Sequence, residues 1–271
     1  MRLSIKHTTR YRFDNPVVHA LQRLRLTPKE TQGQKILEWS MEYENAREEL
    51  TYEDQHHNTT TLVGVEAGAR EVTITCSGRV DTHDHAGVIG RHSGHLPLWS
   101  FLAQTSRTKP GRSMRKLLNE VSNQDLGPLD TLHLLSARVL ERVEYRIGMT
   151  SSQTTGEEAI AAGNGVCQDH AHVFITLVRE LGIPARYVSG YLMMNDRIDQ
   201  EAGHAWAEAH VAELGWVGFD ISNGISPDAR YVRVATGRDY QDAAPITGIS
   251  FGTRSTVLEV DVAVEQQQVQ Q

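Results

Sequence analysis

Apolar and polar side chains alternate along several short segments of the first 81 residues. The apolar positions that recur at every second residue are Leu3 and Ile5, Tyr11 and Phe13, Leu24 and Leu26, Leu37, Trp39, Met41 and Tyr43, and Val72, Ile74 and Cys76. A period of two is typical of strands that bury one face, and turn-forming residues separate the segments at 14–16, 31–33 and 66–68. This spacing predicts a small antiparallel β-sandwich over residues 1–81.

From residue 82 to 112 the alternation lapses into a stretch rich in His, Gly and Pro. Such a composition is typical of a connecting segment. We expect this segment to pack in part through Leu96, Leu98 and Trp99. At the other end of the chain, the Gln-rich residues 265–271 are predicted to form a flexible tail.

Helical spacing begins at about Ser113, which is available as a helix cap. Four helices are predicted. The apolar positions of the first are Met114, Leu117, Leu118 and Val121, and those of the second, which follows Asp130, are Leu132, Leu135, Val139 and Val143. The third spans 157–162, and the fourth has apolar residues Val173, Phe174, Leu177, Val178 and Leu181 and ends before Gly182 and Pro184. Strands are expected at 186–192, 204–211, 216–221 and 258–264. Helices followed by strands predict an α+β fold over residues 113–264, with helices packed on an antiparallel sheet.

Composition places the 271-residue chain among ordinary globular proteins, with 39% hydrophobic and 23% charged residues. A net charge of −7 argues against a nucleic-acid partner, because phosphate binding requires a basic excess. The apolar runs are far shorter than the roughly 20 residues that cross a bilayer, and residues 1–7 lack the apolar core of a signal peptide. We therefore expect no membrane partner and a cytoplasmic location. Two cysteines do not make a disulfide framework.

Three residue types that build a thiol-based catalytic centre follow one another in the second half of the chain. Cys167 stands at a predicted helix start, His204 at the start of a strand and Asp220 near the end of the next strand. The short connection around Gly215 predicts an antiparallel hairpin whose two ends are adjacent, so that Asp220 can orient the imidazole of His204 toward Cys167. The alternative is that His204 and Asp220 are surface residues.

Cys167 is favoured over Cys76 as the nucleophile. Free amide groups at a helix N-terminus stabilise a thiolate and can donate to a developing oxyanion. Gly163 and Gly165 permit a sharp turn that keeps the sulfur accessible. The alternative, a buried structural cysteine, is the usual fate of a free Cys. Cys76 fits that alternative because it shares a strand face with Val72.

Four segments resemble the core of the transglutaminase-like superfamily, and more narrowly its bacterial cysteine-protease branch: 165–172 (GVCQDHAH), 182–191 (GIPARYVSGY), 204–206 (HAW) and 218–220 (GFD). The opening 5–11 (IKHTTRY) and the strand-rich first 80 or so residues resemble the N-terminal β domain of that branch. The resemblance implies a papain-like α+β core. It also implies that Cys167 is the nucleophile, His204 the base and Asp220 the acid that orients the base.

Two departures from the family pattern could alter the shape of the pocket. His170 stands where the family often has an aromatic residue, and 220–223 reads Asp-Ile-Ser-Asn where it often reads Asp-Pro-Thr-Asn. Neither departure touches the three catalytic candidates. The calcium-binding loops of animal transglutaminases have no counterpart in this sequence, so calcium dependence is not carried over and no cofactor is expected.

Further candidates for lining or supporting the pocket are Tyr145, Gln168, Asp169, His172 and Trp206. Tyr145 can offer a hydroxyl to the oxyanion or serve as a packed aromatic residue. Asp169 and His172 either buttress the site or cap and pack the helix, and the second interpretation is favoured. Trp206 shares a strand face with His204 and is placed to wall the pocket.

Glu208 lies on that same strand face and is expected to be solvated. The polar connection 193–203, next to His204, is a candidate for a loop that gates substrate access.

Metal binding is the main chemical rival, because several histidines are crowded together: His83, His85, His92 and His95, and the pair His170 and His172. The sequence has neither a His-Glu-x-x-His helix nor a paired Cys-x-x-Cys, so we expect no catalytic metal.

The sequence thus predicts a cysteine-dependent acyl-transfer enzyme that cleaves a peptide or isopeptide amide of a peptide or protein substrate through a thioester. One alternative is a protein-glutamine transamidase that uses an amine acceptor. Another is a non-catalytic protein-binding module with a vestigial triad.

Overall fold

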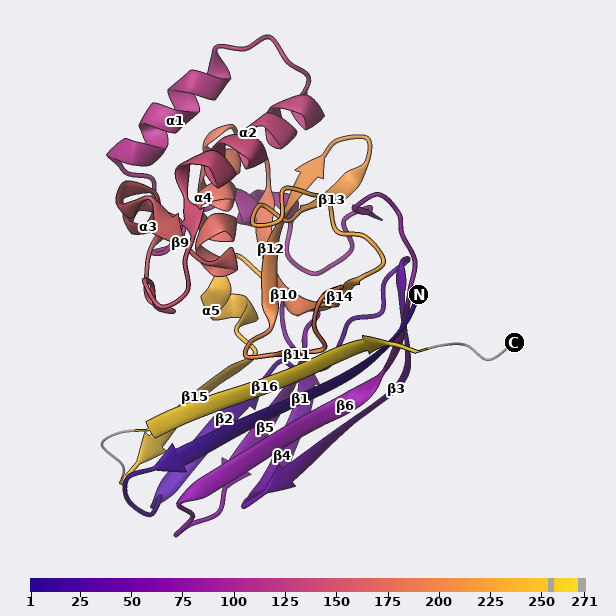
Figure 1. Ribbon diagram of the computed structural model, residues 1–271, viewed down its shortest axis with the longest axis vertical. Helices are drawn as coiled ribbons and strands as arrows, with labels where there is room; N and C mark the ends of the chain where they lie inside the picture. The colour runs from indigo at the N-terminus through magenta and orange to yellow at the C-terminus, as the bar shows by residue number, and fades with distance from the viewer. Residues whose placement is uncertain (253–255, 268–271) are drawn as a thin grey trace.

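Two antiparallel sheets lie face to face at one end of the molecule (Figure 1). The computed structural model describes residues 1–252 and 256–267. One sheet has the order β11-β16-β1-β6-β3, with strands Asp199–Gln200, Thr256–Gln266, Arg2–Phe13, Glu71–Thr82 and Gln34–Glu44. The other has the order β15-β2-β5-β4, with strands Ile246–Phe251, His19–Leu24, Thr59–Val65 and Ala46–Glu53.

The apolar faces of these strands explain why the two sheets pack together. Val72, Ile74 and Cys76 of β6 are fully buried and share one cluster with Leu24 of β2 and Val63 of β5. Their spacing follows the period of two in the sequence, because side chains on a strand point alternately to opposite faces. The predicted antiparallel sandwich is confirmed as a fold, although its sheets also include β11, β15 and β16 from outside residues 1–81.

The last strand is placed differently from the sequence interpretation. It was expected at 258–264 within the helix-rich region, but as β16 it pairs antiparallel with β1 of the sandwich over its whole length. A period of two identifies a strand and not its neighbour, and here the neighbour lies at the opposite end of the chain. β16 also includes residues 265 and 266 of the predicted tail, whereas 268–271 lie outside the described residues.

The helix-rich end contains a third antiparallel sheet with helices packed on it, as Figure 1 shows. Its order is β14-β10-β12-β13-β7, with strands Tyr231–Gly237, Ala185–Leu192, His204–Val211, Gly215–Phe219 and Val88–Gly90. The helices are α1 Arg112–Ser122, α2 Pro128–Arg142, α3 Gly156–Ala162, α4 Cys167–Glu180, α5 Tyr240–Ala243 and the short 3-10 helix η1 Leu98–Leu102. A parallel pair links β8 Glu144–Tyr145 to β9 Asn164–Gly165. The α+β class is confirmed, although the residue that precedes α1 is Gly111, so Ser113 is not its cap.

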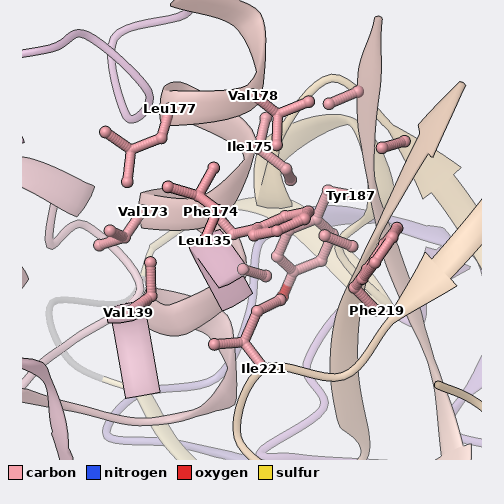
Figure 2. Packing of buried hydrophobic residues seen from close by; sticks show 14 of the residues in the cluster. Leu135, Val139, Val173, Phe174, Ile175, Leu177, Val178, Tyr187, Phe219 and Ile221 are labelled. Carbon is pink, nitrogen blue, oxygen red and sulfur yellow. The ribbon is translucent and has the colours of Figure 1, made fainter. Parts of the chain in front are cut away.

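Helix α4 occupies the centre of this region, in contact with α2, α3 and strand β12. The sequence predicted one apolar stripe, but every residue of α4 from Asp169 to Arg179 is buried, because helices cover one side and the sheet the other. Figure 2 shows Phe174 of α4 close to Phe219 of β13, and their ring centroids are 5.1 Å apart. Such close packing fixes the position of the N-terminus of α4.

The connecting segment 82–112 packs in part against the helix-rich region. Its strand β7 pairs with β13, and Phe101 is buried, with its carbonyl accepting a hydrogen bond of 2.9 Å from Arg179 of α4. Trp99, which was expected to pack, is 70% exposed. The division of the chain at this segment stays a prediction. None of the helices in the described ranges has the length and apolar character needed to span a bilayer.

Candidate active site

Cys167 is the first residue of α4 and follows a tight turn. Gly163 adopts a φ of 72°, a left-handed conformation that favours glycine. A Cβ atom on Gly165 would lie 2.7 Å from the Cβ of Asp169, so a larger residue there would displace that side chain. The turn therefore holds the partly exposed thiol of Cys167 at the helix N-terminus, where the backbone amides favour negative charge.

His204 and Asp220 meet at one end of the β12–β13 hairpin. The strands pair from Ala207 opposite Phe219 to Val211 opposite Gly215, which confirms the hairpin expected from the sequence. His204 opens β12 and Asp220 directly follows β13, so the open end of the hairpin brings them together. The Nε2 atom of His204 lies 2.6 Å from Oδ2 of Asp220.

The carboxylate of Asp220 is fully buried and has further donors besides the imidazole. Tyr231 donates its hydroxyl to Oδ2 at 2.6 Å, and Asn223 donates its side-chain amide to the same oxygen at 2.7 Å. Burial alone would raise the pKa of Asp220, but the hydrogen bond and the positive charge of His204, with the donors Tyr231 and Asn223, lower it. The carboxylate is therefore held ionised beside the ring.

The sequence interpretation missed Tyr231 and Asn223. The 220–223 stretch departs from the family pattern at its two middle residues but keeps the final Asn223, so a signal for this residue was present. Tyr231 opens β14 and no local pattern singles it out, because it reaches Asp220 only once β14 has joined the sheet.

His204 is nearly buried and its protonated form is strongly favoured. Burial would lower the pKa of His204, but hydrogen bonds to Asp220 and Cys167, and the negative charges of these two groups, raise it to about 10. Because Nε2 is taken by Asp220, the other ring nitrogen remains for the thiol. This arrangement allows an imidazolium to stabilise a thiolate at Cys167 and to move a proton at that atom.

A cavity of about 270 Å³ opens beside Cys167 and His204. Its wall combines the helix-rich region with the sandwich, since its lining residues include Val166, Cys167, Gln168, Tyr187, Ser189, Gly190, His204, Ala205 and Tyr240 on one side, and His7, Thr9, Tyr11, Pro245, Ile246, Leu258 and Val260 on the other. Ala202 and Gly203, from the connection proposed to gate access, complete the lining. The sequence interpretation did not anticipate that β1 and β16 would form part of this wall.

Tyr145 and Gln168 lie close to the catalytic candidates. Tyr145 is 48% exposed on β8 and its ring stacks on that of His170, with centroids 6.1 Å apart. Burial, together with the charges of Cys167 and Asp220, raises the pKa of Tyr145 to about 12. Gln168 lines the cavity as the second residue of α4.

Asp169 and His172 act on the helix and its packing, the interpretation that the sequence favoured. Asp169 accepts the backbone N–H of Val166 at 2.8 Å and the hydroxyl of Thr150 at 2.7 Å, and so ties down the turn before Cys167. His172 is fully buried and accepts the backbone N–H of Tyr240 at 3.2 Å. Burial lowers the pKa of His172 to about 3, so this ring is neutral.

Trp206 lies behind His204 and is absent from the cavity lining among the described residues. The two rings stack with centroids 6.2 Å apart, and Trp206 packs edge-on against Tyr231 with centroids 5.4 Å apart. Its position supports the ring of His204 from behind, instead of forming a wall of the pocket.

The expectation that Glu208 is solvated is wrong. Its side chain is fully buried, because the neighbouring strand β10 and the next strand beyond it, β14, each bring an arginine to it. Arg186 of β10 donates to Oε2 at 2.6 Å, and Arg233 of β14 donates to the same oxygen at 2.9 Å. These partners stabilise the buried carboxylate.

The crowded histidines do not gather at the cavity. Among the residues that the structure describes, the potential metal ligands that come together are Glu53, His57 and His95, whose ligand atoms all lie within 4.8 Å of one another. His83 and His85 line a separate small pocket. His170 and His172 form hydrogen bonds within the protein. Within the described residues, that group of potential metal ligands does not include Cys167, His204 or Asp220.

Two family models match the chain. The bacterial transglutaminase-like N-terminal region matches residues 3–81, and the transglutaminase-like superfamily matches residues 115–221. The second match includes Cys167, His204 and Asp220.

Relatives and a solved structure match over almost the whole chain. An uncharacterized protein of Mycobacterium leprae is 27% identical over 277 residues, which cover 97% of this chain and 98% of that protein. An uncharacterized protein of Mycobacterium tuberculosis is 29% identical over 291 residues, covering 97% and 92% respectively. A structure from Cytophaga hutchinsonii, named a "putative cysteine protease", matches with a TM-score of 0.76 and 23% identity, and the match covers 100% of this chain and 92% of that one. At this identity the last match supports the fold.

Proposed function

Because the chain belongs to the transglutaminase-like superfamily, we propose that it is a cysteine-dependent enzyme that cleaves a peptide or isopeptide amide through a thioester. The observation that carries this proposal is the contact between a fully buried, ionised Asp220 and His204, whose pKa is raised in part by Cys167. The three groups match a nucleophile, its base and the group that orients the base.

The reaction proceeds in two halves. The Cys167 sulfur attacks the amide carbonyl carbon, and the backbone N–H of Cys167 at the helix N-terminus donates to the oxyanion. The C–N bond then breaks, His204 gives its proton to the departing amine, and the acyl group stays on sulfur as a thioester. In the second half, neutral His204 takes a proton from water, the resulting hydroxide attacks the thioester, and the acid leaves while the proton remains on His204 beside the regenerated thiolate.

Hydrolysis is favoured over transamidation. A lysine acceptor would approach the thioester as an ammonium ion, which a nearby carboxylate would attract. Among the described residues, the cavity lining includes no Asp or Glu. Water needs no such binding site. We place the enzyme in the cytoplasm, where a thiol such as that of Cys167 stays reduced.

The test incubates the purified chain with a glutamine-containing peptide, a panel of peptide amides and a labelled primary amine. We expect release of amine or ammonia without incorporation of the label, and loss of that activity in the Cys167→Ala variant. The Cys76→Ala variant is the matched control, since its thiol is buried in the sandwich and burial raises the pKa of Cys76 to about 11. Incorporation of the label would establish the transamidase, and no Cys167-dependent product from any amide would favour the binding module.

A further inference from the structure

The cavity beside Cys167 contains polar groups but no permanently charged side chain. Of the residues that line it within the described part of the chain, none is Asp, Glu, Lys or Arg. His7 does not supply a charge either, because its ring bonds to Tyr191 at 2.9 Å and to Thr9 at 3.0 Å, and burial lowers the pKa of His7 to about 4. Apart from the reacting pair Cys167 and His204, the cavity therefore meets a ligand with neutral surface.

Tyrosine rings and aliphatic side chains form most of that surface. Burial raises the pKa of Tyr11 to about 12 and also raises that of Tyr240, so both phenols stay neutral. Opposite the thiol, β1 and β16 contribute cross-strand neighbours: Thr9 pairs with Val260 and Tyr11 with Leu258. Because paired residues project from the same face of a sheet, these side chains reach the cavity together.

We propose that this cavity binds the acyl part of the substrate and selects an uncharged aliphatic or aromatic side chain next to the attacked carbonyl, with Leu258 of β16 as a residue that determines this specificity. This proposal rests on the proposed function. The leaving group departs as a neutral amine once His204 has protonated its nitrogen, and it takes a further proton from water at neutral pH, whereas the acyl group remains attached to Cys167 until water releases it. A cavity with a neutral lining and Cys167 in its wall is therefore suited to bind the acyl group.

Size and charge limit what the cavity accepts. Its volume of about 270 Å³ is below the roughly 300–1,000 Å³ of sites for whole small molecules, so it fits a side chain. A charged side chain entering it would lose water without gaining a counterion, which is unfavourable. The sandwich thus takes part in substrate selection through β1 and β16, in addition to its own folding.

The test measures how fast substrate-like alkylating agents label Cys167, so that it does not depend on turnover. The probes are acetylated chloromethyl ketones of Leu, Phe, Asp and Lys, and iodoacetamide normalises for the intrinsic reactivity of the thiol. We expect the Leu and Phe probes to label Cys167 at least about tenfold faster than the Asp and Lys probes. Mass analysis of the Cys167 peptide gives each rate.

Two matched variants on β16 locate the selectivity. Leu258 is 53% exposed at the cavity and Val257 is 58% exposed on the opposite face of the same strand, so both positions tolerate a carboxylate. Leu258→Asp should raise the Lys rate relative to the Leu rate by about tenfold, while Val257→Asp should leave the ratio unchanged. Equal normalised rates for all four probes, or the same shift in both variants, would overturn the proposal. Selective labelling without amide turnover would support this pocket while rejecting the proposed hydrolysis, and the reverse result would reject only the pocket.

Discussion

Two fully buried carboxylates belong to the same hairpin, yet only one faces the candidate nucleophile. Glu208, in β12, accepts hydrogen bonds from the guanidinium groups of Arg186 and Arg233. Asp220, just after β13, accepts one from the imidazole of His204. Burial would raise the pKa of each carboxyl, and in each case the positively charged partners lower it instead.

The two clusters differ in what their partners can do with a proton. A guanidinium keeps its charge and holds no proton that a substrate can take near neutral pH, so the Glu208 cluster is a fixed structural contact. An imidazole exchanges its proton, and His204 also lines the cavity. Burial of a charge therefore does not by itself indicate a catalytic site, whereas a buried charge beside a titratable partner that lines a cavity marks a candidate.

The largest effect on activity is expected for Asp220→Asn. An amide cannot stabilise the imidazolium and can hold the ring of His204 in the wrong tautomer, so we expect kcat to fall by about 10³–10⁴-fold. Tyr231 can still donate to the amide oxygen, so the fold should be kept. Steady-state kinetics on whichever peptide amide of the panel the chain cleaves, with the melting temperature measured in parallel, checks both expectations. A loss of less than about threefold would remove Asp220 from the mechanism.

The second prediction concerns Glu208→Gln, for which we expect the opposite result: a loss of stability with little change in kcat. Replacing this carboxylate leaves Arg186 and Arg233 buried without an anion, so the free energy of unfolding should drop by about 3–5 kcal/mol. Each folded molecule should keep a kcat close to that of the original chain, because neither arginine lines the cavity.

Two measurements separate the expected loss of stability in Glu208→Gln from any change in kcat. Denaturant unfolding gives the free energy of unfolding, and titration of the reactive Cys167 thiol counts the folded molecules on which kcat is based. Glu208→Asp, which retains the charge, should recover part of the lost stability and serves as the variant to study if the amide form does not fold. A large loss of kcat in well-folded protein would show that the two clusters do not differ in the way described.

The same hairpin shows which structural features could be predicted from the sequence and which could not. Its two strands and the meeting of His204 with Asp220 could be predicted, because a period of two and a tight turn are local signals. The surroundings of Glu208 could not be predicted, since Arg186 and Arg233 come from β10 and β14, two successive strands on one side of β12, and local periodicity does not reveal the order of strands in a sheet.

The same reason explains the errors at β16 and in the cavity wall. Leu258 and the strand that carries it were recognisable by alternation, but the partner strand β1 lies at the other end of the chain. The contribution of the sandwich to the cavity depends on that pairing. A side chain such as Tyr231, which joins the site only through sheet assembly, was hidden for the same reason.

The smallest expected effect is on the pH dependence of the free energy of unfolding, which should differ between the Asp220 cluster and the Glu208 cluster. In the folded chain the pKa of His204 is raised to about 10, against about 6.5 for an unperturbed histidine. A group whose folded-state pKa is raised contributes stability that is complete below pH 6.5 and is lost as the pH rises through the folded value. The free energy of unfolding should therefore decline between about pH 7 and pH 10 because of this residue.

The comparison is made best in a Cys167→Ala background, because the thiol of an unfolded chain itself titrates near pH 8.5. There the hydrogen bond that His204 donates to Asp220 still raises the pKa of His204, so chemical denaturation at pH 7, 8 and 9 should show a steeper decline than in the same background with His204→Gln. The Glu208 carboxylate stays ionised throughout this range, since its pKa is lowered, and Glu208→Gln should leave the slope between pH 7 and 9 as it is. Parallel curves with and without His204 would mean that the imidazole gains no proton affinity on folding, and the contrast between the two carboxylates would then lose its physical basis.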